Sequence, residues 1–207
     1  MFKTEKITYG DVVLHLMYYS SYDINNHLHN LLPEEIERLN CFKHPSRKQE
    51  FVATRILRSI VVGNEPILYN EIGAPFIESE GYISISHAKN VVGLAFCKDF
   101  PIGLDLEPID KKVLRVKHKF LNKSEIESLN TDDITEMIKV WSGKEALYKL
   151  AERKGIVFAK ELLLEKINDS SWSGYIIHQN TRKKVSLSIE KKDNFVISIN
   201  LKAPLND

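Results

Sequence analysis

Residues 101–108 read PIGLDLEP, and this short segment opens the second half of the chain. Apolar and acidic residues alternate in it, so we predict a β-strand. Side chains two residues apart on a strand point to the same face of the sheet. Asp105 and Glu107 are therefore expected side by side, with Leu104 and Leu106 on the opposite face.

Two adjacent carboxylates repel each other unless a cation or a proton lies between them. Mg²⁺ takes oxygen ligands of this kind and keeps water or phosphate oxygens in its other positions. A solvated strand end is the ordinary interpretation, and for two acids alone it is the more frequent one, because acids are mostly exposed. The acidic pair by itself leaves both interpretations open.

Residues 141–149 read WSGKEALYK, which is predicted to be helical. Trp141, Glu145 and Lys149 are spaced four residues apart and share one helix face, while Lys144 lies on a neighbouring strip. An exposed Glu–Lys pair with the tryptophan packed in the core would explain this pattern equally well. Such a pair contributes only a few tenths of a kcal/mol.

The composition excludes several classes of protein. The 207 residues carry 29 Lys and Arg against 28 Asp and Glu, a net charge of +1, which argues against a general nucleic-acid binder. No apolar run reaches the roughly 18 residues of a membrane span, and the start MFKTEKITYGD lacks a secretory core. Cys41 and Cys97 have no metal-type spacing, which predicts a reduced, cytoplasmic protein.

Two long helices are expected, one in each half of the chain. The first begins at Ser46, capped by its hydroxyl with Gln49 closing a capping box, and ends at Gly63. The second covers residues 133–154 and ends at Gly155. A hairpin turn is predicted at residues 192–194. Strands are predicted at residues 12–19, 67–69, 83–86, 91–96, 102–106, 162–167, 172–178, 184–189 and 195–201.

This order predicts an α+β protein of two similar lobes, residues 1–100 and residues 101–207. Each lobe would consist of a long helix packed on a small antiparallel sheet. The functional site is expected where the lobes meet.

Taken together, the two motifs resemble the two-part signature of the 4′-phosphopantetheinyl transferase superfamily. That signature is Gly-hydrophobic-Asp-x-Glu, followed about forty residues later by an aromatic, a small residue, x-Lys-Glu and a further Lys. Residues 102–107 and 141–149 fill every diagnostic position. The length and the two lobes are similar to the long, single-chain (surfactin-synthetase-activating) type, which implies a monomer that holds the whole site in one chain.

Upstream segments extend the resemblance. ISISH at residues 83–87 is similar to the strand-ending Ser-His motif of the family, which implies that Ser86 and His87 contact coenzyme A phosphates. The helix at residues 47–55 implies that Arg47 and Arg55 meet the 3′-phosphate of coenzyme A.

One turn departs from the family pattern. The adenine-binding turn is commonly Gly-Lys-Pro, and here it is Gly73-Ala74-Pro75. The glycine and the proline keep the turn geometry, so both are expected to bind the cofactor, but the lysine charge is missing at Ala74.

The resemblance implies a reaction. Phosphopantetheine would move from coenzyme A to a serine of an apo acyl or peptidyl carrier protein, releasing adenosine 3′,5′-bisphosphate. Asp105, Glu107 and Glu145 would hold Mg²⁺, and Glu145 would also act as the general base. Lys149 would act with Glu145 in catalysis and, like His87, contact phosphate oxygens. Two roles stay open for Lys144, orienting Glu145 or meeting a phosphate, and the pathway of the carrier stays open as well.

Two other functions are compatible with parts of this pattern. A Mg²⁺-dependent nuclease or phosphatase could use three acids and a lysine, but the neutral net charge and the upstream segments argue against it. A degenerate transferase that only binds coenzyme A or a carrier protein is the other, and the intact Asp105, Glu107, Glu145 and Lys149 argue against such decay.

Overall fold

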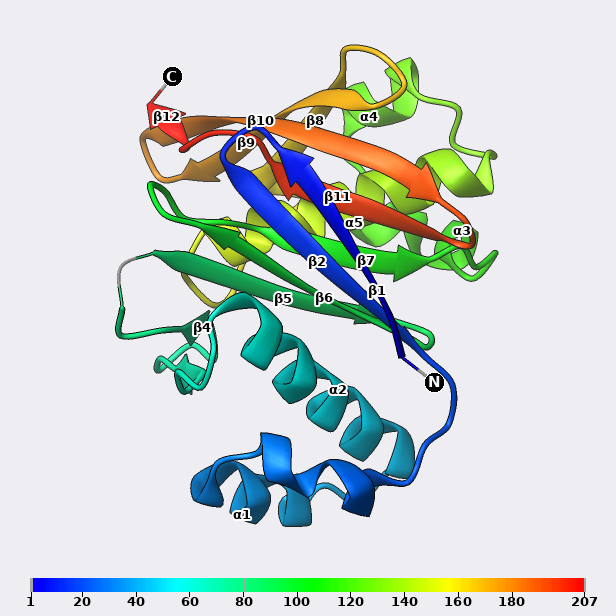
Figure 1. The fold of residues 1–207 in the computed structure, drawn as a ribbon. Helices are drawn as coiled ribbons and strands as arrows, with labels where there is room; N and C mark the ends of the chain where they lie inside the picture. The colour runs from blue at the N-terminus through cyan, green and yellow to red at the C-terminus, as the bar shows by residue number, and fades with distance from the viewer. Residues whose placement is uncertain (1, 80, 207) are drawn as a thin grey trace.

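Two antiparallel β-sheets pack face to face at the centre of the molecule, and a long helix covers the outer face of each (Figure 1). The structure is a computed structural model and describes residues 2–79 and 81–206. The arrangement confirms the predicted α+β class. In the described part of the chain, no helix is long and apolar enough to cross a membrane.

The first sheet has the order β1-β2-β6-β5, and all its neighbours are antiparallel. Its strands are β1 (Phe2–Tyr9), β2 (Val12–Tyr19), β5 (Tyr82–Ala88) and β6 (Val91–Cys97). Helix α2 (Pro45–Val61) packs its apolar side on one face of this sheet. The strands thus come from both sides of α2 in the sequence.

The second sheet has the order β7-β11-β10-β9-β8, with β12 paired to β10. Helix α5 (Ile134–Leu150) packs on it through the largest apolar cluster of the protein. The strands are β7 (Leu104–Pro108), β8 (Leu162–Lys166), β9 (Ser171–His178), β10 (Thr181–Lys192), β11 (Phe195–Asn200) and β12 (Leu205–Asn206).

Short elements complete the chain around these layers. They are η1 (Ile24–Asn30), α1 (Pro33–Cys41), β3 (Leu68–Tyr69), β4 (Pro75–Phe76), α3 (Val113–Val116), η2 (Lys117–Lys119), α4 (Lys123–Ser128) and α6 (Phe158–Glu161). Strands β3 and β4 pair with each other in a small separate hairpin.

The two sheets share an apolar core and polar links. Residues of β2 and β6 pack against residues of β7 and β11 in one continuous cluster. The hydroxyl of Ser84 on β5 accepts a hydrogen bond from the amide of Leu104 on β7 at 3.0 Å, and Ser86 does the same for Leu106 at 3.0 Å. Because the halves share this core, the two-lobe division at residue 100 stays a prediction.

The start of α2 differs from the prediction. His44 is the N-cap residue and Pro45 occupies the first turn, so the predicted Ser46 cap is wrong. Proline fixes a helical φ and lacks an N–H that would need a partner, so it starts the helix one residue earlier. The Gln49 amide is used elsewhere, donating to the Ser21 hydroxyl at 3.3 Å and the Tyr22 carbonyl at 3.1 Å.

The end of α5 also differs. Asp133 caps its first turn, as the predicted start requires, by accepting from the amide of Glu136 at 2.8 Å. The helix ends at Leu150 rather than Lys154, and Glu152 adopts a left-handed conformation with φ of 51°. The chain therefore turns before Gly155, whose φ of 76° serves a second turn.

Each predicted strand has an observed counterpart, one of them shifted, and three observed strands were not predicted: β1, β4 and β12. Strand 12–19 is confirmed with its bounds, and the predicted hairpin joins β10 to β11, with Asp193 at a φ of 50°. The predicted strand 102–106 is shifted and runs over β7. Strand β1 was not predicted, because its many charged residues lie on an edge strand that faces solvent.

Candidate active site

A cavity of about 490 Å³ lies between α2, β5 and α5. Its walls come from segments far apart in the sequence, so only the fold brings them together. Eight of the residues predicted for the site or singled out for the adenine-binding turn line it: Arg47, Arg55, Gly73, Ala74, Pro75, His87, Glu145 and Lys149.

Asp105 is the buried centre of the carboxylate group beside this cavity, with 6 % of its surface exposed. Its Oδ1 accepts hydrogen bonds from the Ser86 hydroxyl and the Lys149 ammonium, both at 3.2 Å. Its Oδ2 is buried and has no hydrogen-bond partner among residues 2–79 and 81–206. An unpartnered buried carboxylate oxygen is costly unless a cation or proton meets it.

Glu107 lies two residues further along β7, as the alternation predicts. Its Oε1 accepts a hydrogen bond from the indole N–H of Trp141 at 2.6 Å. Burial raises the pKa of Glu107, and the nearby charge of Asp105 raises it further. The repulsion expected between the carboxylates of Asp105 and Glu107 is therefore present.

Glu145 reaches the same carboxylates from α5. Burial raises the pKa of Glu145 to about 7, and the charges of Asp105 and Glu107 add to this effect, while Lys149 opposes it. A carboxyl group with a pKa near the working pH can both hold and release a proton. The structure thus brings Asp105, Glu107 and Glu145 together electrostatically.

Lys149 ties the two sheets and α5 together at the site. Its ammonium donates to the Leu104 carbonyl, to Asp105 Oδ1 at 3.2 Å and, over a longer distance of 3.5 Å, to the Ile85 carbonyl. These three acceptors match the three donors of an ammonium group. A phosphate contact by Lys149 would replace one of them.

Ser86 faces β7 and does not line the cavity. It holds Asp105 Oδ1 and the Leu106 amide, so in the structure it positions a carboxylate rather than facing a ligand space. His87 lies on the other face of β5, at the cavity wall.

The cavity mouth carries a polar group formed by Arg47, Glu50 and His87. Arg47 NH1 lies 3.0 Å from Glu50 Oε2 and 3.1 Å from His87 Nε2. Burial lowers the pKa of His87, with Arg47 and Lys149 adding to this effect and Glu50 opposing it. Glu50 was not among the predicted site residues, although its position three residues after Arg47 on the same helix was a usable signal.

Arg55 lines the cavity but is fully engaged. Its Nε donates to Glu35 Oε1 at 2.9 Å, and both terminal nitrogens lie 3.4 Å from the Tyr69 hydroxyl. The guanidinium also stacks over the Phe51 ring, 4.0 Å from its centroid. Only 2 % of Arg55 is exposed, so this residue braces α1 and α2 in the structure, and its predicted phosphate contact stays a prediction.

The turn at residues 73–75 is organised by Asn70. Its side-chain oxygen accepts from the amide of Ala74 at 2.9 Å, and Gly73 has a φ of 86°, which favours glycine. Lys154 donates to the Glu71 carbonyl at 3.0 Å, so a cation from beyond α5 contacts the loop in which Ala74 replaces lysine. Asn70, three residues before Gly73, was the unused sequence signal for this turn, because asparagine side chains often bond to the backbone of turns.

Lys144 takes no part in the site. It is completely buried, and its ammonium donates to Glu125 Oε2 at 2.7 Å and to the Phe120 carbonyl. Neither of the two roles left open for it, orienting Glu145 or meeting a phosphate, matches these contacts. Lys144 instead anchors α5 to the segment around α4.

A divalent cation fits the donors at the site but not their present conformation. Over residues 2–79 and 81–206, no group of three or more His, Cys, Asp or Glu side chains is arranged to hold a metal ion. Asp105 Oδ2 is nevertheless buried without a partner, and the pKa values of Glu107 and Glu145 are raised by their neighbours. Carboxylate oxygens are hard ligands of the kind that Mg²⁺ prefers, so the donor types at this site suit the ion.

Comparison with known proteins gives a family match for part of the chain. No curated protein matches the sequence. The match lies in the half that carries Asp105, Glu107, Glu145 and Lys149: residues 101–200, just under half of the chain, match the model of the 4′-phosphopantetheinyl transferase superfamily.

Proposed function

We propose that the protein is a Mg²⁺-dependent 4′-phosphopantetheinyl transferase of the long, single-chain type. It moves phosphopantetheine from coenzyme A to a serine of an apo acyl or peptidyl carrier protein. One observation carries the proposal: Asp105, Glu107, Glu145 and Lys149, the residues of the family signature, converge beside a cavity. The match of residues 101–200 to the superfamily model supports it.

Glu145 is the general base in this proposal. With a pKa of about 7, a substantial fraction of Glu145 is ionised at neutral pH and able to accept the proton of the attacking serine hydroxyl on a carboxylate oxygen. A base of this pKa gains more from proton transfer than an ordinary glutamate would. Lys149 holds Asp105 in place through Oδ1 and keeps a positive charge at the cavity wall.

The cavity suits a phosphorylated small molecule. Its volume of about 490 Å³ lies within the usual range for ligand sites. The Arg47 and His87 side chains supply polar contacts at one part of the wall, and the turn with Gly73 and Pro75 supplies backbone at another. Coenzyme A is the ligand that this wall and the signature support together.

Asp105, Glu107 and Glu145 are the proposed Mg²⁺ ligands. The unpartnered Oδ2 of Asp105 and the raised pKa values of the two glutamates support this assignment. When bound, the ion would neutralise charge on the pyrophosphate and stabilise the leaving nucleotide.

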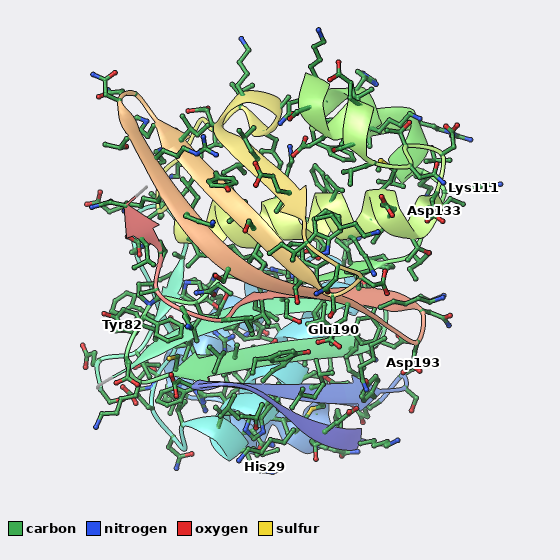
Figure 2. The ribbon with its side chains drawn as sticks, turned by 90° about the horizontal axis from the view of Figure 1, so that it is seen from above. His29, Tyr82, Lys111, Asp133, Glu190 and Asp193 are labelled. Atoms are coloured by element: carbon green, nitrogen blue, oxygen red, sulfur yellow. The ribbon has the colours of Figure 1, made fainter. Side chains whose placement is uncertain are left out.

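The basic segment that follows strand β7 is the proposed contact for the carrier protein. Lys111, Arg115 and Lys119 are spaced four residues apart around α3 and η2, and none forms an ion pair with the residues that the structure describes. Val116 lies among them and is 38 % exposed. Lys111 lies at the edge of the molecule opposite Tyr82, which lines the cavity (Figure 2). An acidic helical domain would match this charge and apolar contact.

Two further parts of the proposal concern assembly and compartment. Residues from both halves of the chain line the cavity, so a single chain can supply the site, which supports a monomeric enzyme. Cys41 and Cys97 are both free thiols, which supports a reducing compartment such as the cytoplasm.

Mass spectrometry of an apo carrier protein tests the proposal. The protein is incubated with Mg²⁺, coenzyme A and a panel of apo acyl and peptidyl carriers, with EDTA replacing Mg²⁺ in a control. We expect a carrier to gain one phosphopantetheine on its serine, and the gain to disappear with EDTA. Coenzyme A binding without transfer to any carrier would indicate a binding protein and refute the proposal.

A further inference from the structure

Trp141 joins α5 to the carboxylates of β7 through a single hydrogen bond. Its indole N–H donates to Glu107 Oε1 at 2.6 Å. The residue lies one helical turn before Glu145, and sequence reasoning gave it only a packing role. The bond therefore connects a residue that was expected only to pack in the core to a proposed metal ligand.

The indole ring is held firmly by its neighbours. It stacks on Phe158, with centroids 5.4 Å apart and an angle of 25° between the planes, and it lies 5.3 Å from the Phe120 ring. Rings packed on two sides have little rotational freedom, so the N–H of Trp141 is a donor at a fixed position. It can hold a carboxylate oxygen more rigidly than a lysine could.

Asp105 and Glu107 show the same pattern of hydrogen bonds. In Asp105, Oδ1 is held by Ser86 and Lys149, while Oδ2 has no partner. In Glu107, Oε1 is held by Trp141, and no residue among 2–79 and 81–206 donates to Oε2. Each carboxylate thus has one oxygen fixed by the protein and the other left without a donor.

The second tryptophan of the chain shows that this pairing is not a general need of the fold. Trp172 on β9 is 1 % exposed, yet its Nε1 is buried without a partner. The protein tolerates one indole N–H without a hydrogen bond. The N–H of Trp141 is paired, and its acceptor is a carboxylate of the proposed site.

We propose that Trp141 is a positioning residue that fixes Glu107 Oε1 and so leaves Oε2 ready for the divalent cation. The inference rests on the proposed function only for the assignment of Glu107 as a metal ligand. Outer-sphere partners of this kind typically change metal affinity by about 10- to 100-fold when removed.

Mn²⁺ binding, measured by the loss of its free electron paramagnetic resonance signal, tests this without any transfer activity. The variants are Trp141→Phe, which keeps an aromatic ring but removes the donor, and Trp172→Phe as the matched control. Titrations are run with and without coenzyme A. We expect about tenfold weaker Mn²⁺ binding for Trp141→Phe and wild-type binding for Trp172→Phe.

A second pair of variants shows whether Trp141 acts through Glu107. In a Glu107→Ala background, Trp141→Phe should change Mn²⁺ affinity by less than about twofold, because the acceptor is already gone. An undiminished effect in that background would overturn the inference, as would equal effects of the two Trp→Phe variants or no effect of Trp141→Phe.

Fluorine NMR keeps the inference testable if Trp141→Phe fails to fold. The wild-type chain has two tryptophans, so labelling with 5-fluorotryptophan gives two signals, which Trp172→Phe assigns. Mg²⁺ should shift the Trp141 signal and leave the Trp172 signal in place. If Mg²⁺ shifts neither signal, the inference fails. That failure is distinct from failure of the proposed function, which the carrier assay reports.

Discussion

Helix α5 carries two lysine–carboxylate clusters that differ in how completely they are satisfied. We call Lys144 with Glu125 the inner cluster, and Lys149 with Asp105, Glu107 and Glu145 the site cluster. Both contain buried charges, and both lysines belong to the segment 141–149. Only the site cluster lies beside the cavity.

Every strong acceptor of the inner cluster has a donor. Glu125 Oε2 accepts from Lys144 at 2.7 Å and from the amide of Asn122 at 2.9 Å, while Oε1 accepts from the amide of Leu164 at 2.9 Å. Burial lowers the pKa of Lys144, and the charge of Glu125 opposes this. The charges compensate each other, so this cluster connects three elements without a need for a ligand.

The carboxylates of the site cluster, by comparison, lack a full set of donors and counter-charges. Its one lysine faces three carboxylates, one oxygen of Asp105 has no partner, and the pKa values of Glu107 and Glu145 are raised. Buried groups of one sign are costly to keep together in the absence of a ligand. The difference supports the proposal that the inner cluster serves stability and the site cluster serves binding and chemistry.

Replacing Glu145 by Gln tests the proposed catalytic role of the site cluster, and it has the largest expected effect. Glutamine keeps the size of the side chain but can neither accept the serine proton nor supply a charged metal ligand. We expect the single-turnover rate of phosphopantetheine transfer to fall by about 10²- to 10⁴-fold. Mass spectrometry of the carrier protein at timed intervals measures this rate.

The matched control for this variant is Glu152→Gln, an exposed glutamate that follows α5 and also lines the cavity. It carries a charge near the ligand space but is not part of the site cluster. A similar loss of rate in both variants would mean that general cavity charge, rather than Glu145, limits the reaction.

Replacing Lys144 by Ala tests the contribution of the inner cluster to stability. The substitution leaves the Glu125 carboxylate buried without its counter-charge, so we expect the free energy of unfolding to fall by about 3–5 kcal/mol. Urea denaturation followed by circular dichroism measures this. Coenzyme A affinity of the folded fraction should stay unchanged, because Lys144 does not line the cavity.

Lys139→Ala is the control within the same helix. Lys139 is also buried, but its ion-pair partner Asp169 has 91 % of its side chain exposed. Water can therefore solvate Asp169 after the substitution, and the loss should be nearer to about 1 kcal/mol. Equal losses in the two variants would contradict the special status of the inner cluster.

The pH dependence of stability distinguishes the clusters in metal-free protein. The pKa of Glu145 is raised to about 7 in the folded state, above the ordinary 4.5 of glutamate. The folded state therefore binds this proton more tightly than the unfolded state. The resulting stabilisation is fully present below pH 4.5 and is lost as the pH rises through 7.

Glu145→Gln removes this titration, so the variant should melt on the order of a few degrees above wild type at pH 8. The difference should be small at pH 5. Differential scanning calorimetry in EDTA at both pH values measures it. If the difference between variant and wild type is the same at pH 5 and pH 8, Glu145 does not titrate in this range.

Local patterns explain which parts of the fold could be predicted. Alternation in residues 101–108 placed Asp105 and Glu107 on one face, and a four-residue spacing placed Glu145 with Lys149 on α5. Both predictions use geometry fixed by the chain itself. The boundaries were less predictable, because Pro45 starts α2 early and the left-handed Glu152 ends the second helix early.

Long-range partners could not be predicted from local patterns. The spacing of residues 141–149 places Lys144 and Glu145 on neighbouring strips of the helix but does not show what each strip contacts. Lys144 is buried against Glu125, and Glu145 lines the cavity. Arg55 likewise shares a helix face with Arg47 but is paired with Glu35, which comes from α1. Such partners are chosen by tertiary packing.

A third lysine extends the comparison to the surface and gives the smallest expected effect. Lys154 follows Lys144 and Lys149 at five-residue intervals, and it is exposed where Lys144 is buried. Its only hydrogen bond among the described residues goes to the Glu71 carbonyl at 3.0 Å, in the loop before the turn at Ala74. An exposed contact of this kind contributes about 1 kcal/mol at most.

We therefore expect Lys154→Ala to weaken coenzyme A binding by less than about fivefold and to leave the melting temperature within about two degrees of wild type. Isothermal titration calorimetry at two salt concentrations measures the binding. Exposed charges are screened by salt, so the effect of the substitution should shrink as salt rises. If Lys154→Ala lowered the free energy of unfolding as much as Lys144→Ala does, the exposure of a lysine would not determine its contribution to stability. A loss of affinity above tenfold would instead assign Lys154 directly to the ligand, as the cation that the turn lacks at Ala74.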